Sequence, residues 1–94
     1  MPYVLVAYDI SDDRRRTLVC DRLKAMGFTR AQKSVYIARG GSSRAKDVAR
    51  ALHRYVDRSE DSVLVLVLPH EVLDKAMIIG VNRVKMNERS FAII

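Results

Sequence analysis

The chain has 94 residues, of which 17 are Lys or Arg and 11 are Asp or Glu, so its net charge is +6. Apolar residues make up 49% of the chain, which excludes a disordered protein and predicts one small folded domain over residues 1–94. Twelve of the 17 basic residues are Arg, whose planar guanidinium suits phosphate oxygens, so the charge favours a nucleic-acid partner. The alternative is a solvated basic surface with no partner.

Cysteine usage and hydropathy bear on the compartment. Cys20 is the only cysteine, and one thiol forms neither an intrachain disulfide nor a zinc cluster. The sequence shows no secretory leader and no run of about 18 apolar residues, the length that a membrane-spanning helix needs. We therefore expect a cytoplasmic protein without membrane contact.

A strand and a helix open the predicted secondary structure. Residues 2–8 (PYVLVAY) form a short apolar run rich in Val and Tyr, which is typical of a strand. Ser11 or Asp12 is suited to cap the helix that follows, and Gly27 is suited to end it. The apolar stripe of this helix consists of Val19, Cys20, Leu23 and Met26.

The middle of the chain predicts an extended segment, a second helix and the most apolar strand. Residues 28–39 alternate in polarity as extended chain does. Ser42 or Ser43 is suited to cap a helix whose apolar stripe consists of Ala45, Val48, Ala49, Leu52 and Val56. Residues 62–69 (SVLVLVLP) contain an unbroken apolar run, so we expect this strand to be central in the sheet and covered on both faces.

The remaining segments are short. Residues 70–76 predict a helical turn, residues 77–81 a short strand and residues 91–94 (FAII) an apolar tail. The order of elements predicts an α+β sandwich with two helices on one face of a sheet. Because two helices cover only one face, we expect a second copy of the chain to cover the other in a homodimer, with FAII adding as an edge strand to that partner.

Asp9 and Arg16 are the first candidate functional residues. Asp9 stands at the carboxyl end of the first strand, where strand-to-helix turns expose functional side chains. Arg16 precedes Val19 and Cys20 by three and four residues, so it shares their inward stripe and should point toward the sheet end. A structural ion pair between the two residues is one interpretation, and a shared catalytic site is the other.

Three short segments in order carry a family resemblance. They are VLVAYDISDDRRR at 4–16, GFTRAQKSVYIARG at 27–40 and DSVLVLVLP at 61–69. Together they resemble the CRISPR-associated protein 2 family, whose R-x-Q-x-S-V-[FY] segment corresponds here to Arg30, Gln32, Ser34, Val35 and Tyr36. Ile37 stands where the family often has Glu, so no acidic role is carried over to that position.

The resemblance implies a ferredoxin-like βαββαβ sandwich with an antiparallel sheet and an extra C-terminal strand. It also implies a homodimer whose sheets pack face to face and bring the two Asp9 carboxylates together near the dyad, where Mg²⁺ binds. The implied work is the acquisition of new CRISPR spacers beside the CRISPR-associated integrase. Metal-dependent endonuclease activity on RNA or DNA is attributed to several members.

The chemistry expected at this site uses few residues. Asp9 would be the metal ligand and a catalytic residue, and Arg16 or Arg15 would stabilise charge on the phosphate. Asp12 and Asp13 are better explained as charges that complement the helix dipole. A metal-free alternative uses His53 or His70 as acid or base, although both positions look structural. The residues expected to contact the nucleic-acid backbone, without reading sequence, are Arg14, Arg15, Arg16, Arg30, Arg39 and Arg44.

Two functional classes therefore stay open. The first is a Mg²⁺-dependent endonuclease, and the second is a non-catalytic dimeric adaptor that holds DNA for the CRISPR-associated integrase. A ribonuclease toxin of related fold is a more distant alternative. Tyr8 and Tyr36 can stack on bases, but their positions inside strand patterns favour packing in the core or at the dimer contact.

Overall fold

The computed structural model describes residues 1–86 and 91–93. Its first six elements are β1 (Tyr3–Asp9), α1 (Asp13–Ala25), β2 (Thr29–Gln32), β3 (Val35–Arg39), α2 (Ser42–His53) and β4 (Ser62–Leu68). They are followed by α3 (His70–Asp74), β5 (Met77–Ile78) and β6 (Ala92–Ile93). The predicted α+β order is confirmed, and the extended segment 28–39 proves to be the hairpin of β2 and β3.

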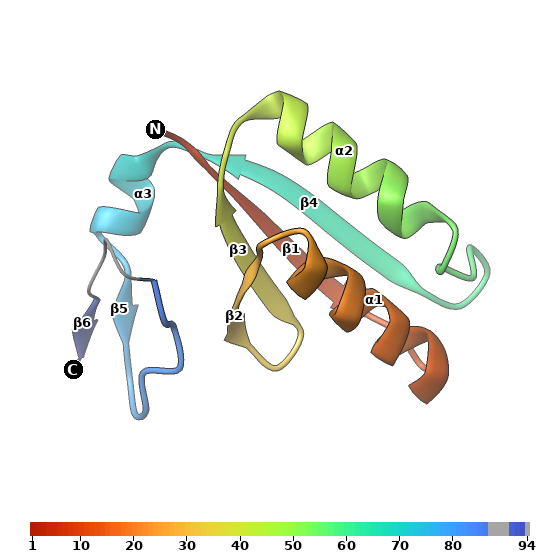
Figure 1. Ribbon diagram of the computed structural model, residues 1–94. Coiled ribbons are helices and arrows are strands. Elements are labelled where there is room, and N and C mark those ends of the chain that lie inside the picture. Colours follow the sequence, from red (N-terminus) through yellow and green to blue (C-terminus); the bar gives the residue numbers. More distant parts are fainter. Residues whose placement is uncertain (87–90, 94) are drawn as a thin grey trace.

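The main sheet has the strand order β2-β3-β1-β4, with every neighbouring pair antiparallel. Figure 1 shows α1 and α2 side by side on one face of this sheet, as predicted. The prediction that residues 62–69 form a central strand is wrong, because β1 takes the central place and β4 lies at the edge. On the side of β4 away from the helices, Leu64 is 53% exposed and Leu66 is 40% exposed.

The ends of the two long helices follow local chemistry. The Asp12 side chain caps α1 by accepting a hydrogen bond from the backbone N–H of Arg15 at 2.8 Å, as one of the two predicted caps. Gly27 follows α1 with a φ of +85°, a conformation that favours glycine. The predicted serine cap of α2 is wrong by one residue, because Gly41 occupies the cap position and its carbonyl accepts from Ala45 N–H at 3.0 Å.

The core lies between the helices and the sheet. Its fully buried members include Val4, Val6, Val19, Leu23, Tyr36, Val48 and Leu52. The rings of Tyr8 and Tyr36 stack with centroids 6.1 Å apart, and the Tyr36 hydroxyl lies 2.8 Å from Cys20 Sγ. Burial raises the pKa of both tyrosines. The expectation that these two rings serve packing rather than base stacking is confirmed.

The other face of the sheet, here the open face, is partly covered by the chain itself. Tyr3, Ile37 and Leu73 form a second buried cluster against which Met86 and Phe91 pack. A second copy is therefore not required over this half of the face, contrary to the sequence argument. The half that stays uncovered, the open patch, consists of Leu5, Ala7, Val35, Leu64 and Leu66.

The C-terminal strands stand apart from the main sheet, as Figure 1 shows. β5 and β6 pair with each other in parallel through two residues each. The predicted strand over residues 77–81 is thus shorter than expected, and the last residue of FAII lies outside the described residues. Within the described part of the chain, no helix combines the length and the apolar character needed to cross a membrane.

Candidate active site

Asp9 is the last residue of β1 and pairs with Ser62 of β4 in the sheet register. Because side chains alternate along a strand, Asp9 shares the open face with Tyr3 and Leu5. Its side chain is exposed and makes no hydrogen bond or ion pair with any residue in the described ranges. The carboxylate oxygens of Asp9 are therefore available to a ligand.

Apolar surface borders this carboxylate. Ala7, two residues before Asp9 on the same face, pairs with Leu64 on one side and Val35 on the other. Leu64 is more than half exposed, so Asp9 stands at the rim of the open patch rather than in a polar pocket. Uncovered apolar side chains are suited to contact a partner, and the partner can place further charged groups beside the exposed acid.

The predicted ion pair between Asp9 and Arg16 is absent from the described residues. The guanidinium of Arg16 instead pairs with the Asp13 carboxylate one helical turn away and donates to the carbonyl oxygen of Ile10 at 2.8 Å. Because Asp13 and Arg16 are three residues apart on α1, their side chains lie on the same face of the helix, close enough to pair. Arg16 remains 38% exposed, and its bond to the Ile10 carbonyl anchors it to the residue directly after Asp9.

Arg15 is held by an aspartate that the sequence reasoning did not select. Its Nε lies 2.9 Å from Asp61 Oδ2, and a second guanidinium nitrogen lies 3.3 Å from Oδ1. The Asp61 side chain is 0% exposed and also accepts from the backbone N–H groups of Ser11 and Asp57. The hydrogen bond from Arg15, first among these contacts, lowers the pKa of Asp61 to about 2.

These contacts tie two loops together at the Asp9 end of the sheet. Ser11 lies in the loop between β1 and α1, and Asp61 lies in the loop between α2 and β4. Glu60 adds a 3.5 Å ion pair to Arg15. The only sequence signal for this network was an acidic residue directly before an apolar strand, which says nothing about its distant partner.

The predicted nucleic-acid-binding arginines form two groups rather than one surface. Arg14, Arg15 and Arg16 lie in the first turns of α1, near Asp9. Arg39 pairs with Tyr3 at the opposite end of β1, about 20 Å away for seven strand residues. Arg30 lies on β2, between the levels of the two groups along the sheet. Its guanidinium donates to the Lys33 carbonyl at 2.9 Å.

Arg44 has a structural role. Its guanidinium donates to the carbonyl of Met26 at the end of α1 and to that of Arg39 at 3.1 Å. It also lies 5.1 Å from the centre of the Phe28 ring, within the range of a cation–π contact. These contacts join the end of α1 to the start of α2, so only part of this charge remains for nucleic acid.

The two histidines are not brought to Asp9. His53 lines a hollow beside Val63 and Val65, whose side chains face the helices, whereas Asp9 lies on the open face. His70 follows the opposite end of β4, where Nδ1 lies 3.0 Å from Glu71 Oε1. Among the described residues, no three His, Cys, Asp or Glu side chains gather in a way that would hold a metal ion.

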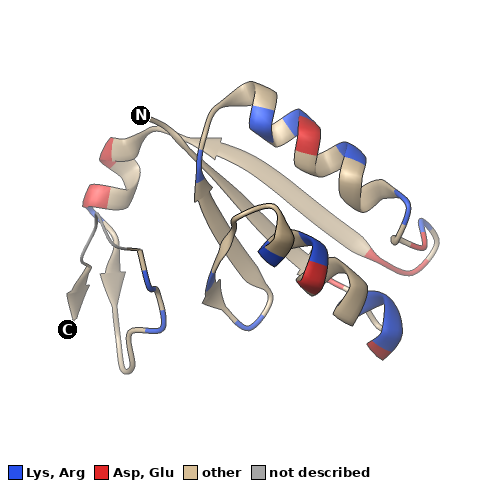
Figure 2. Ribbon diagram, in the orientation of Figure 1, with Lys and Arg blue, Asp and Glu red and all other residues tan. Residues whose placement is uncertain are grey.

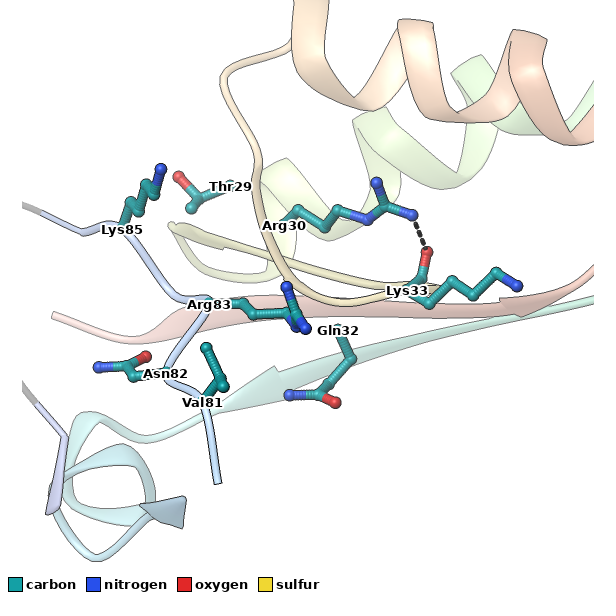
Figure 3. Close-up of a pocket in the computed structure, with 8 residues that line it drawn as sticks. All are labelled: Thr29, Arg30, Gln32, Lys33, Val81, Asn82, Arg83 and Lys85. Atoms are coloured by element: carbon teal, nitrogen blue, oxygen red, sulfur yellow. Dashed lines mark hydrogen bonds between the residues drawn. The ribbon is translucent and has the colours of Figure 1, made fainter. Parts of the chain in front are cut away.

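Sequence reasoning also missed a basic cleft. It lies between β2 and residues 81–85 and has a volume of about 920 Å³. Figure 3 shows its lining, which consists of Thr29, Arg30, Gln32, Lys33, Val81, Asn82, Arg83 and Lys85. We call it the β2 cleft. Its only sequence signal was the alternation of cations in VNRVK, far along the chain from β2.

Comparison with known sequences identifies the family. The family described as "CRISPR associated protein Cas2" matches residues 1–76. A "CRISPR-associated endoribonuclease Cas2" of Aeropyrum pernix is 49% identical, over 85% of this chain and 87% of the relative. Another of that description, from Thermus thermophilus, is 36% identical over 83% of this chain and 82% of its own length. A "CRISPR-associated endonuclease Cas1/endonuclease Cas2 fusion" of Thermoproteus tenax is 31% identical, over 80% of this chain and 28% of the fusion.

Solved structures agree in fold. A hypothetical protein from Thermus thermophilus superposes with a TM-score of 0.63 at 29% identity, covering 71% of this chain and 80% of that one. A Streptococcus pyogenes Cas2 structure gives 0.61 at 25% identity, covering 72% and 87%. The ferredoxin-like fold predicted from the resemblance is confirmed. On the sequence match over residues 1–76 and these relatives, the chain belongs to the CRISPR associated protein Cas2 family.

Proposed function

We propose that this protein is a CRISPR-associated endoribonuclease that acts in spacer acquisition and hydrolyses phosphodiesters at a pair of Asp9 carboxylates on a homodimer axis. The names of its relatives from Aeropyrum pernix and Thermus thermophilus support the activity. The observation that carries the site is the exposed Asp9 side chain, without a hydrogen bond or ion pair among the described residues, at the rim of the open patch.

The open patch supports the homodimer. Fully burying an exposed leucine contributes about 1.5–3 kcal/mol, so burying the exposed half of Leu64 or Leu66 contributes roughly half as much. A two-fold contact buries both leucines of both chains at once. Asp9 borders Leu64 through Ala7, so a two-fold contact at this end of the patch would bring the two Asp9 side chains toward each other. The meeting of apolar surface and carboxylate supports an axis that passes beside Asp9.

Asp9 fits the metal that the family implies, but only as half of a site. Mg²⁺ prefers oxygen ligands and keeps several waters, and Asp9 offers two unpaired carboxylate oxygens. Within the described ranges, no three acidic, His or Cys side chains of one chain gather to hold a metal ion, so the second carboxylate ligand would come from the second Asp9. When bound, Mg²⁺ would supply a Lewis acid that offsets charge on the phosphodiester.

The chain's own residues position the substrate. Arg16 pairs with Asp13 and donates to the carbonyl of Ile10, and its exposed part would supply a donor to a phosphate oxygen of the substrate. The contacts of Asp61 with Arg15 and Ser11 hold the loop that follows Asp9. The substrate phosphate thus meets a carboxylate on a strand end and a guanidinium on a helix start, both rigid elements.

A non-catalytic adaptor is the second candidate, and one observation favours it. Each chain contributes a single carboxylate, whereas metal-dependent nucleases usually gather more acidic groups. The Thermoproteus tenax relative, described as a fusion of a Cas1 endonuclease with a Cas2 endonuclease, supports a CRISPR-associated integrase as the partner in either case. In this alternative the dimer holds nucleic acid, and the partner performs the chemistry.

The Asp9→Asn variant tests the proposal. We expect it to abolish RNA cleavage that depends on Mg²⁺, while RNA binding in EDTA and the dimer mass in light scattering stay unchanged, because the side chain keeps its shape. Asp21→Asn is the matched control, since Asp21 is an exposed acid on α1 away from the open face. Cleavage by the Asp9 variant at the wild-type rate excludes this active site and leaves the adaptor role.

A further inference from the structure

The β2 cleft carries positive charge without a compensating acid. Four of its eight lining residues are Arg or Lys, and none is Asp or Glu. Arg83 and Lys85 are exposed and form no ion pair or hydrogen bond with residues of the described ranges. Figure 2 shows basic residues on the segment that follows β5 and in the turn between β2 and β3, and acidic residues on α3 and at the start of β4. Concentrated and unpaired cations in a hollow attract an anionic ligand.

The cleft is part of a longer groove along the edge of the sheet. A hollow of about 310 Å³ shares Thr29 and Lys85 with it, and another of about 430 Å³ shares Gln32 and Arg83. Figure 3 shows Arg83 extending from the C-terminal segment toward β2. β2 is an edge strand, so backbone groups on its outer side have no strand partner and can bind a ligand. Four strand residues give this edge a length of about 13 Å.

The dimensions of the groove favour a single strand over a duplex. A volume of about 920 Å³ is typical of pockets that enclose one small ligand. A duplex, whose major groove alone is about 12 Å wide, would only lie across the mouth. Among the described residues, no aromatic side chain lines the β2 cleft to stack on a base, whereas Thr29, Gln32 and Asn82 offer hydrogen bonds suited to phosphate and sugar. The ligand that fits is a sugar–phosphate backbone.

One end of the groove lies at the same end of the sheet as Asp9. Gln32 pairs with Val35, and Val35 pairs with Ala7, two residues before Asp9. The turn after β2 is joined to β1 by the bond from Tyr8 N–H to the Ser34 carbonyl at 3.0 Å. Two strand spacings, about 10 Å, separate β2 from β1.

We propose that the β2 cleft binds the phosphodiester backbone of a single nucleic-acid strand and leads that strand to Asp9. The delivery to Asp9 rests on the proposed nuclease function, whereas the binding does not. Arg83 and Lys85 form one wall, and Arg30 forms the other, held in place by its bond to the Lys33 carbonyl. Recognition through phosphate predicts that RNA and DNA strands of one sequence bind alike.

The test is fluorescence anisotropy in EDTA with a short labelled single-stranded RNA, the DNA strand of the same sequence and the corresponding RNA duplex. The Arg83→Ala/Lys85→Ala variant should bind either strand roughly tenfold more weakly. Its slope of log affinity against log salt should fall by about 1.4, at about 0.7 per lost contact on a single strand. Arg30→Ala, on the opposite wall, should lower the slope by about half as much.

Arg22→Ala/Lys24→Ala is the matched control, because it removes one Arg and one Lys of the same spacing from the exposed end of α1, outside the cleft. An equal loss in this control, or wild-type binding by the Arg83/Lys85 variant, would overturn the proposal. An equal loss on the duplex would overturn the single-strand assignment. Absence of cleavage by the wild-type protein contradicts the nuclease proposal alone, since every binding measurement is made without Mg²⁺.

Discussion

The two faces of the β2-β3-β1-β4 sheet are built differently from the same strands. On the helix side, Val4, Val6 and Tyr36 have no exposed surface. Among the described residues, no buried side-chain nitrogen or oxygen lacks a hydrogen-bond partner. On the open face the same β1 strand ends in Asp9, whose carboxylate pairs with no other described residue, beside leucines that remain about half exposed. Packing on the helix side therefore supplies most of the folding stability. The open face remains available to contact a partner and to hold a catalytic site.

A pair of leucine truncations tests this division and has the largest expected effect. Leu23→Ala removes a fully buried side chain of α1 and should cost about 2–5 kcal/mol of unfolding free energy. Leu66→Ala, on the open face, should cost less than about 1 kcal/mol under conditions in which the protein is monomeric. Urea denaturation of both variants at low protein concentration measures the difference. Equal losses would contradict the division of roles.

A charge on the open patch should separate association from folding. Leu64→Glu removes an apolar side chain from the proposed contact, and the two introduced carboxylates would repel each other across the axis. The dimer association constant should therefore fall by about tenfold or more. Leu18→Glu is the control, because Leu18 is 39% exposed but lies on α1, away from the patch. Analytical ultracentrifugation gives both association constants. The open patch is not the dimer contact if only the Leu18 variant dissociates.

Lowering the pH should produce the smallest change in stability, and that change should come from the ion pair between Asp61 and Arg15. The pKa of Asp61 is lowered from 3.8 to about 2 in the folded chain, so the folded state binds its proton later than the unfolded state does. The stabilisation by Asp61 is therefore complete above about pH 3.8 and disappears as the pH falls toward 2.

Asp61→Asn should be less stable than the wild type at neutral pH, and the difference should shrink over that acid interval. Thermal melts at several pH values measure it, with Asp21→Asn as a control, because Asp21 is an exposed acid on α1 outside this network. A constant difference at all pH values would show that Asp61 acts through packing and not through its charge.

The amino-acid sequence by itself determined the elements with strong local signals. The periodic stripes of α1 and α2, the cap at Asp12 and the stop at Gly27 all lie within a few residues of the structure they specify. The position of Asp9 at the end of the sheet could also be predicted, because a polar residue that closes an apolar strand lies at a sheet end in any topology. Short-range geometry is nearly the same in every fold, so these features could be predicted.

Tertiary structure alone decided which distant residues meet. An unbroken apolar run indicates a buried strand, but β4 lies at the edge and pairs only with β1, whereas β1 pairs with both β3 and β4. Arg16 forms an ion pair with Asp13, and Arg15 forms one with Asp61, which lies 46 residues away in the sequence. The β2 cleft formed where residues 81–85 returned beside β2. Such pairings depend on how the chain closes its long loops, and the residues on either side carry no local pattern that records the partner.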